Sequence, residues 1–337
     1  MRVVVSGGSG FLGSHLCEAL LRRGDSVRCL DDFSSGRASN IAHLMHEPGF
    51  ECTTCDVTDR FRVSGPVDAV VHLASPASPF DYARRPLETL AAGSRGTENL
   101  LRLAAEHHAR FVLASTSEVY GDPTEHPQDE EYWGNVNPIG PRSVYDESKR
   151  FAEALTMAYR RSRDADTGIA RIFNTYGPRM RAHDGRVVST FVRQALDKEP
   201  LTVFGDGGQT RSLCYVDDLI RGLLALLDTS LPGPYNLGNS EERTVRELAE
   251  LVLRLTGSAG PLRFLPLPVD DPTRRRPALA RAREELGWRP RVPLEEGLRR
   301  TVAWFATQPA TSVHPPERPV TQPAATSGDG GRGPLPS

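Results

Sequence analysis

The glycine-rich stretch GGSGFLG, Gly7–Gly13, directly follows the apolar run RVVVS and opens a helical pattern. That pattern is FLGSHLCEALLRRGD, with leucines four residues apart at Leu12, Leu16 and Leu20 and a glycine near its end. A strand, a glycine turn and a helix in this order bind a diphosphate, because backbone N–H groups at the helix start face the anion. The stretch therefore predicts the first unit of a dinucleotide-binding sheet.

The first half of the chain continues to alternate strands and helices. Short apolar runs that end in turn residues predict further strands at SVRCLD, FECTTCD, DAVVHLAS, RFVLAST and GIARIFN. Helical patterns cover about 86–108 and about 143–163. Residues 1–178 are thus predicted to form an α/β domain, a Rossmann-type doubly wound parallel sheet.

Beyond Pro178 the alternation breaks. The short strand candidates LTVFG, YNLG and LRFL mix with helices expected near 187–198, 216–227, 245–255 and 294–305. We predict that 179–307 is mainly a smaller substrate-binding lobe over the C-terminal edge of the sheet, with parts of the later segments returning to the first domain. Residues 308–337 are rich in Pro, Thr, Gly and Ser, which predicts a disordered tail.

Composition narrows the class of partner. Of 337 residues, 38% are hydrophobic and 25% charged, and the net charge of -2 favours neither nucleic acid nor an anionic membrane. The apolar N-terminal strand is too short to span a membrane and lacks a signal-peptide pattern, so we expect a cytoplasmic protein. Cys52 and Cys55 have a metal-like spacing, but positions three apart on a strand face opposite ways, so we expect reduced thiols and no metal.

The glycine loop and the strand ends predict the cofactor site. Gly7 permits the turn, Gly10 lets a pyrophosphate approach the backbone, and Gly13 permits close helix packing. Asp31 ends the second strand, where its carboxylate can accept both ribose hydroxyls of NAD and repel the extra phosphate of NADP. Asp32 is a rival for this role, and a nearby cation would soften the exclusion. The other candidates for cofactor contact are Phe11, Leu12, Arg37 (the nearby cation), Asp56, Val57, Leu73, Ala74 and Ser75.

Tyr145 and Lys149 lie four residues apart and hence on one face of a helix. A free tyrosine has a pKa of about 10. We expect the ammonium group and a positive nicotinamide ring to lower it, so that Tyr145 can take a hydroxyl proton while hydride leaves the same carbon. Thr116 ends the strand RFVLAST and can hold that hydroxyl. In this order along the chain, the residues predict hydride chemistry on an alcohol.

Several long motifs resemble one family. GGSGFLGSH, HLASPASP, STSEVYGDP, EHPQDEEYWGNVNPIGPRSVYDESKR, RIFNTYGPRM, DGRVVSTF, PLTVFGDGGQTR and PLEEGL are similar to those of UDP-glucuronate decarboxylases, or UDP-xylose synthases, which are extended short-chain dehydrogenase/reductases. The resemblance covers about 2–305 and implies a smaller C-terminal UDP-sugar-binding lobe and a homodimer joined by helices. It implies catalytic roles for Thr116, Glu118, Tyr145, Lys149 and Arg275, and substrate contacts for Glu118, Asn174, Arg211 and Arg275.

The pair Ser117-Glu118 distinguishes the reactions open to a 4-keto sugar. A 4-epimerase needs no carboxylate there, and a 4,6-dehydratase of the same family carries an aspartate where this chain has Ser117. Loss of carbon dioxide from glucuronate needs no leaving-group acid, because the C4 ketone accepts the electron pair. We expect Glu118 to orient the ring and a water near C5. Because an arginine that gripped the C6 carboxylate tightly would stabilise the ground state, we expect Arg275 to act through water or at the pyrophosphate.

Three alternatives remain open. The nearest is an oxidative decarboxylating UDP-glucuronate dehydrogenase that releases UDP-4-keto-pentose and NADH; a UDP-sugar 4-epimerase and a non-catalytic NAD-sensing module are weaker. Arg275 lies in the basic run Arg274–Arg276, and such runs are usually solvated. The chain departs from the family pattern in two places: Ala91-Ala92-Gly93 replaces polar residues found in relatives, and Cys214 replaces another.

Overall fold

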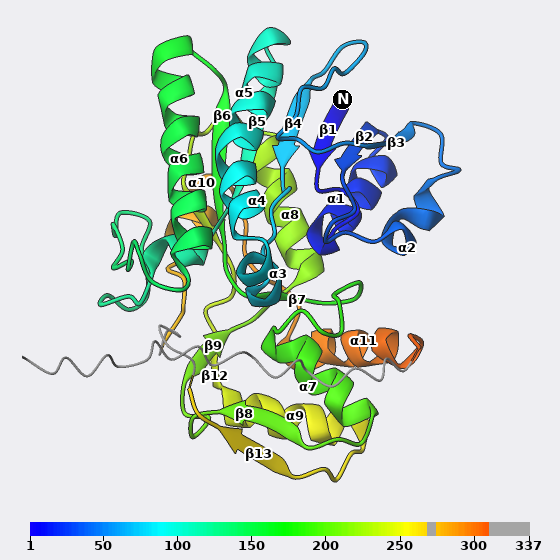
Figure 1. Cartoon of the computed structure of the whole chain (residues 1–337), viewed down its shortest axis with the longest axis vertical. Coiled ribbons are helices and arrows are strands. Elements are labelled where there is room, and N and C mark those ends of the chain that lie inside the picture. Colours follow the sequence, from blue (N-terminus) through cyan, green and yellow to red (C-terminus); the bar gives the residue numbers. More distant parts are fainter. Residues whose placement is uncertain (268–273, 310–337) are drawn as a thin grey trace, which may run out of the picture.

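Seven strands form one parallel sheet within the described part of the chain, residues 1–267 and 274–309 of a computed structural model (Figure 1). Their order is β11-β6-β5-β4-β1-β2-β3, and each neighbouring pair is parallel. The strands are β1 (Arg2–Ser6), β2 (Ser26–Asp31), β3 (Phe50–Thr54), β4 (Ala69–His72), β5 (Arg110–Thr116), β6 (Thr167–Ile172) and β11 (Tyr235–Leu237). The predicted fold class is confirmed, and the order reverses between β1 and β4, where such sheets bind ligands.

Helices cover both faces of the sheet. On one face, α1 (Phe11–Arg22) and α8 (Val216–Leu227) pack against each other and share a core with Val3, Val5 and Val71. On the other face, α5 (Thr97–Glu106) and α6 (Ser143–Arg163) bury a second core around Val4, Val70 and Phe111. Because apolar residues face both layers, the strands are continuously hydrophobic, as the sequence predicts. Short helical segments link these elements: α2 (Ala38–Ile41), η1 (Ala42–Leu44), α3 (Pro79–Arg84) and η3 (Ser117–Tyr120).

The helix predicted over 86–108 runs without a break from Pro86 to Glu106 but contains a π-helical turn. It consists of α4 (Pro86–Ala91), a π-helical turn η2 (Ala92–Gly96) and α5. Gly93 in the π turn lies so close to α6 that a Cβ there would sit 2.7 Å from the carbonyl oxygen of Ser148. Gly93 thus permits a backbone contact between two helices, which gives this departure from the family pattern a packing reason.

A smaller lobe lies below the carboxyl edge of the sheet in Figure 1. Its helices α7 (Val187–Leu196), α9 (Val245–Thr256) and α11 (Leu294–Ala306) pack together, beside the parallel pair β8 (Leu201–Phe204) and β13 (Leu262–Leu265). Two further pairs connect lobe and sheet: β7 (Thr175–Tyr176) with β10 (Cys214–Tyr215), and β9 (Thr210–Ser212) with β12 (Glu242–Thr244). β11, α8 and α10 (Ala280–Glu285) return from the second half of the sequence to the sheet, with α10 packed against β11.

The structure also places the two cysteines of the metal-like motif. Cys52 packs towards the core of α1 and Cys55 towards that of α5, so the two free thiols lie on opposite sides of the sheet as predicted. The described residues hold no group of three or more metal-ligating side chains placed to bind a metal. None of their helices is long and apolar enough to cross a membrane. Apart from Gln308 and Pro309, the predicted tail lies outside the described residues.

Candidate active site

A cavity of about 850 Å³ lies between the carboxyl ends of the strands and the small lobe. Every predicted site residue lines it except Arg37, which is exposed on the rim loop. Although Arg37 as a whole is exposed, partial burial of its guanidinium, together with the charge of Arg181, lowers its pKa. The predicted residues that line the cavity are Gly7, Gly10, Phe11, Leu12, Gly13, Asp31, Asp32, Asp56, Val57, Leu73, Ala74, Ser75, Thr116, Glu118, Tyr145, Lys149, Asn174, Arg211 and Arg275.

The glycine loop forms one end of the cavity. Gly7 has a φ of +73° and lies against the end of β4, where a Cβ would come within 2.7 Å of the Ala74 nitrogen. Only glycine meets both demands without strain. The hydroxyl groups of Ser9 and Ser75 are buried here without a hydrogen-bond partner among the described residues. A narrow backbone loop with unused polar atoms fits the pyrophosphate and ribose of a dinucleotide.

Asp31 is only 6% exposed at the end of β2. Its carboxylate accepts hydrogen bonds from the backbone nitrogens of Ser9 (2.9 Å) and Phe33 (2.8 Å), so it also shapes the loop. Each oxygen keeps a further lone pair for a ribose hydroxyl. The rival Asp32 is exposed and accepts from the Ser34 nitrogen at 2.9 Å. The burial and orientation of Asp31 favour it over Asp32 as the ribose ligand.

Thr116, Tyr145 and Lys149 meet in the middle of the cavity, where β5 ends beside the first turns of α6. The Lys149 ammonium donates to the Ala114 carbonyl oxygen at 2.9 Å, and its nitrogen is 6.0 Å from the centroid of the Tyr145 ring. Burial lowers the pKa of Lys149 to about 8. Burial also raises the pKa of Tyr145, and an interaction with Thr116 opposes this. The protein groups alone therefore shift the Tyr145 pKa upwards, against the expectation from Lys149, because the phenol is 7% exposed.

Glu118 is held by two arginines. Arg142 donates to one carboxylate oxygen at 2.5 Å, and Arg275 forms an ion pair with the other while also donating to the Gly121 carbonyl oxygen at 3.2 Å. Burial alone would raise the pKa of Glu118, but Arg275 and Arg142 outweigh it and lower the pKa to about 2. Arg275 is 4% exposed, so it is a paired group in the site and not part of a solvated basic run.

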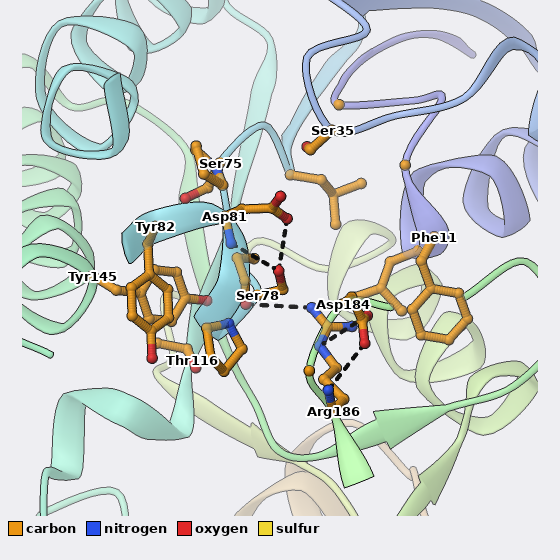
Figure 2. Close-up of a pocket in the computed structure, with 18 of the residues that line it drawn as sticks. Phe11, Ser35, Ser75, Ser78, Asp81, Tyr82, Thr116, Tyr145, Asp184 and Arg186 are labelled. Carbon is orange, nitrogen blue, oxygen red and sulfur yellow. Dashed lines mark hydrogen bonds and ion pairs between the residues drawn. The ribbon is translucent and has the colours of Figure 1, made fainter. Parts of the chain in front are cut away.

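Sequence reasoning missed four polar residues of this region. Arg142 lies three positions before Tyr145, within one of the family-like motifs quoted above. Its partner, the Glu118 carboxylate, lies 24 residues away in the sequence. Tyr82 stacks on the Tyr145 ring (Figure 2), and Arg186 reaches from the start of α7 to the Ala77 carbonyl oxygen at 3.3 Å. Asp146 is buried beside the arginines. No spacing rule marks these residues, because their partners come from other segments.

The predicted substrate contacts Asn174 and Arg211 share the cavity with one of the two family departures but not with the other. Asn174 and Arg211 line the cavity, and Arg211 donates to the Thr210 carbonyl oxygen at 2.8 Å. Ala91 and Ala92 also line it, so the loss of polar groups in the π turn does affect the cavity wall. Cys214 is fully buried in the core of the lobe and is not part of the lining.

The comparisons with known proteins agree with this geometry. Residues 3–238 match the model of the NAD dependent epimerase/dehydratase family, and the chain belongs to this family. NAD, predicted from the sequence, is the cofactor of this family. The curated relatives include UDP-glucuronic acid decarboxylase 1 of Arabidopsis thaliana, 52% identical over 305 residues, which are 90% of this chain and 70% of the relative. UDP-glucuronic acid decarboxylase 1 of Danio rerio is 49% identical, over 91% of this chain and 73% of the relative. The resemblance to UDP-glucuronate decarboxylases is thereby confirmed.

Solved structures of similar fold include other enzymes of the family. UDP-glucose 4-epimerase of Thermotoga maritima superimposes with a TM-score of 0.84 at 28% identity, covering 90% of this chain and 98% of the other. UDP-glucuronic acid 4-epimerase of Bacillus cereus, in complex with UDP-glucuronic acid and NAD, gives 0.83 at 28% identity, covering 90% and 99%. Since the fold serves more than one reaction, the reaction must be argued from the residues of the site.

Proposed function

We propose that the protein converts UDP-glucuronate to UDP-xylose and carbon dioxide by NAD-dependent, redox-neutral decarboxylation through a UDP-4-keto intermediate. The observation that carries this proposal is the carboxylate Glu118, clamped by Arg142 and Arg275 next to Tyr145 in the same cavity. The similarity to curated decarboxylases supports it. A 4-epimerase needs no such carboxylate, and Ser117 supplies no acid for a dehydratase.

Each of these residues has a separate role in the proposed reaction. Thr116 holds the C4 hydroxyl and Tyr145 takes its proton, with Lys149 fixed beside it. Gly7, Gly10, Gly13 and Asp31 would hold NAD, which would supply the acceptor for the C4 hydride and the source of its return. The resulting ketone is β to the C6 carboxylate, so the C5–C6 bond breaks and the C4 carbonyl takes the electron pair. Tyr145 finally returns its proton to the C4 oxygen.

The pairing of Glu118 supports a loose hold on the substrate carboxylate. Arg142 and Arg275 each already bind Glu118, and that carboxylate offsets part of the positive charge that they offer to the C6 carboxylate. A tight grip would stabilise the substrate more than the transition state. On this proposal Glu118 and Arg275 orient the sugar through water, and Asn174 and Arg211 contact the UDP portion.

One experiment tests the reaction. The purified protein is incubated with UDP-glucuronate and NAD, and the nucleotide sugar is identified by mass and proton NMR while NADH absorbance is followed. We expect UDP-xylose, one carbon dioxide per turnover and no accumulating NADH. Stoichiometric NADH with UDP-4-keto-pentose would assign the oxidative dehydrogenase instead, and UDP-galacturonate would assign a 4-epimerase.

We also propose a homodimer in which α4 and α6 meet their counterparts in a second copy. Leu87 and Leu90 on α4 and Phe151 on α6 are 76%, 39% and 51% exposed, and such a cluster of exposed apolar side chains is typical of an interface. Phe151→Glu should shift sedimentation from dimer to monomer. Trp133 is an exposed aromatic residue on a different segment, so Trp133→Glu should not cause this shift.

The free cysteines support a reducing, cytoplasmic location.

A further inference from the structure

Decarboxylation leaves one proton unassigned. When the C5–C6 bond breaks, its electron pair forms an enolate between C5 and the C4 oxygen, and C5 must then take a proton to become a CH₂ group. Tyr145 holds the proton that returns to the C4 oxygen, so it cannot also supply C5. Glu118 cannot supply it either, because its two arginines keep it ionised. The donor is therefore either the water that Glu118 is expected to orient or a further acid in the cavity.

Tyr82 is the phenol best placed for this task. It lies on α3, is 6% exposed, lines the cavity, and stacks on Tyr145 with ring centroids 5.3 Å apart and an angle of 10° between the planes. Figure 2 shows the two rings face to face beside Thr116. Its hydroxyl makes no hydrogen bond to any described residue, unlike that of Tyr120, which donates to Asn236 at 2.8 Å. The Tyr82 hydroxyl is thus available to a substrate.

The charges around Tyr82 suit a proton donor. Burial raises its pKa to about 12, so the group keeps its proton at neutral pH. Arg142 and Arg275 oppose this shift and would stabilise the phenolate left after the proton has moved, whereas the charges of Glu118 and Asp146 favour the protonated phenol. α3 itself is fixed: Ser78 caps it by accepting from the Asp81 nitrogen at 3.2 Å, and Asp81 forms an ion pair with Arg181 of the segment that leads into α7.

We propose that Tyr82 is a further catalytic residue, whose phenolic hydroxyl delivers the proton that C5 takes after carbon dioxide has left. The O–H bond of Tyr82 breaks, the C5–H bond forms at the expense of the enolate double bond, and the C4 carbonyl is restored. The phenolate then takes a proton from water, so solvent hydrogen enters C5 once per turnover. This inference rests on the proposed function and adds the donor that it lacks.

The test is Tyr82→Phe in heavy water, which keeps the ring and the stacking but removes the hydroxyl. The unmodified protein should place one deuteron at a single one of the two C5 positions of UDP-xylose. In the variant, water has to protonate C5 unaided, so the deuteron should spread over both positions. UDP-xylose formation should fall about 10²-fold, the lower range for a general acid, while the oxidation step continues and NADH accumulates. Tyr235→Phe is the matched control, because that buried hydroxyl bonds Glu285, away from the cavity.

The outcomes separate the two proposals. If the unmodified protein forms no UDP-xylose, the proposed function fails. If it does, and Tyr82→Phe still deuterates one C5 position only, Tyr82 is not the donor, whatever the rate. The position of the deuteron does not depend on how much of the variant folds, so a poorly folded variant remains informative. A single deuterated position together with loss of NADH formation would show that Tyr82 only positions Tyr145.

Discussion

The two ends of the cavity are built in different ways. At the cofactor end, one continuous stretch supplies the glycine loop, and Asp31 completes it through backbone hydrogen bonds at 2.8 and 2.9 Å. At the sugar end, Tyr82, Glu118, Arg142 and Arg275 come from four separate segments; ion pairs hold the last three, and Tyr82 stacks on Tyr145. The difference teaches that a shared cofactor needs a shape the backbone can provide, whereas the particular reaction depends on a balance of buried charges.

The largest effect should come from the residue between the two ends. Tyr145→Phe removes the base for the first oxidation, so no 4-keto species and no NADH should form. General acid–base groups contribute about 10²–10⁴ in rate, or roughly 3–5 kcal/mol, and we expect a loss of about 10³ in turnover. NAD binding, measured by fluorescence, should remain. Near-normal NADH formation in a single turnover would contradict the assigned role.

The next effect tests whether the charge balance at the sugar end matters. Glu118→Ala removes the carboxylate shared by the buried Arg275 and the half-buried Arg142, and breaking a buried ion pair costs roughly 3–5 kcal/mol. Turnover should fall about 10²-fold, a typical contribution for one polar group near the reacting atoms. Because Tyr145 is intact, some NADH or 4-keto-pentose should leak, as it should not from Tyr145→Phe.

A control separates catalysis from folding in that experiment. Asp197→Ala breaks a comparable ion pair in the lobe, where Arg193 donates to Asp197 at 2.6 Å outside the cavity lining. This variant should lose stability but keep the ratio of UDP-xylose to leaked intermediate. If Glu118→Ala makes UDP-xylose at a near-normal rate, its carboxylate is structural only.

At the cofactor end, replacing the ribose ligand should have a smaller effect, limited to the affinity for NAD. Hydrogen bonds to a charged group contribute about 1.5–3 kcal/mol, so Asp31→Ala should weaken NAD at least about tenfold and narrow the preference for NAD over NADP. Isothermal titration with both cofactors measures this. Asp32→Ala is the matched control and should change neither affinity. The reverse pattern would make Asp32 the ribose ligand, and equal binding of both cofactors by the unmodified protein would remove the basis for the preference.

The same contrast explains how far the sequence could predict the molecule. The parallel sheet, its helices and the cofactor loop follow from local patterns, because each apolar run and each glycine acts within one segment. The π-helical turn at Ala92–Gly96 was missed because it lies where α6 approaches at Ser148, a contact that local patterns do not reveal. Arg142 and Tyr82 were missed because the side chains that they contact, Glu118 and Tyr145, lie far away in the sequence. The expected fall of the Tyr145 pKa rests on Lys149 and a bound nicotinamide ring; burial of the phenol, which spacing does not reveal, raises the pKa against them.

The smallest expected effect concerns stability, and it tests the protonation of Asp146, a second carboxyl group near Glu118 and its two arginines. Asp146 is 5% exposed and one of its oxygens has no hydrogen-bond partner among the described residues. Burial and the charge of Glu118 raise its pKa to about 7, although Arg142 and Arg275 oppose the shift and Glu147 adds slightly to it. The folded state therefore favours the protonated carboxyl, and stability should fall as pH rises from about 4, the value for an unfolded aspartate, to about 7.

Asp146→Asn removes this dependence without removing the hydrogen-bonding shape. Its melting temperature should exceed that of the unmodified protein at pH 8, by about 2–4 °C for each kcal/mol recovered in domains of 150–250 residues, and the two should converge near pH 4. The difference in melting temperature between the two proteins isolates Asp146. Glu118, with its pKa of about 2, makes stability fall as pH drops below about 4.5, but it contributes equally to both proteins. Equal melting temperatures at pH 8 would mean that the arginines keep Asp146 ionised at no cost, and that the charge at the sugar end extends beyond the Glu118 clamp.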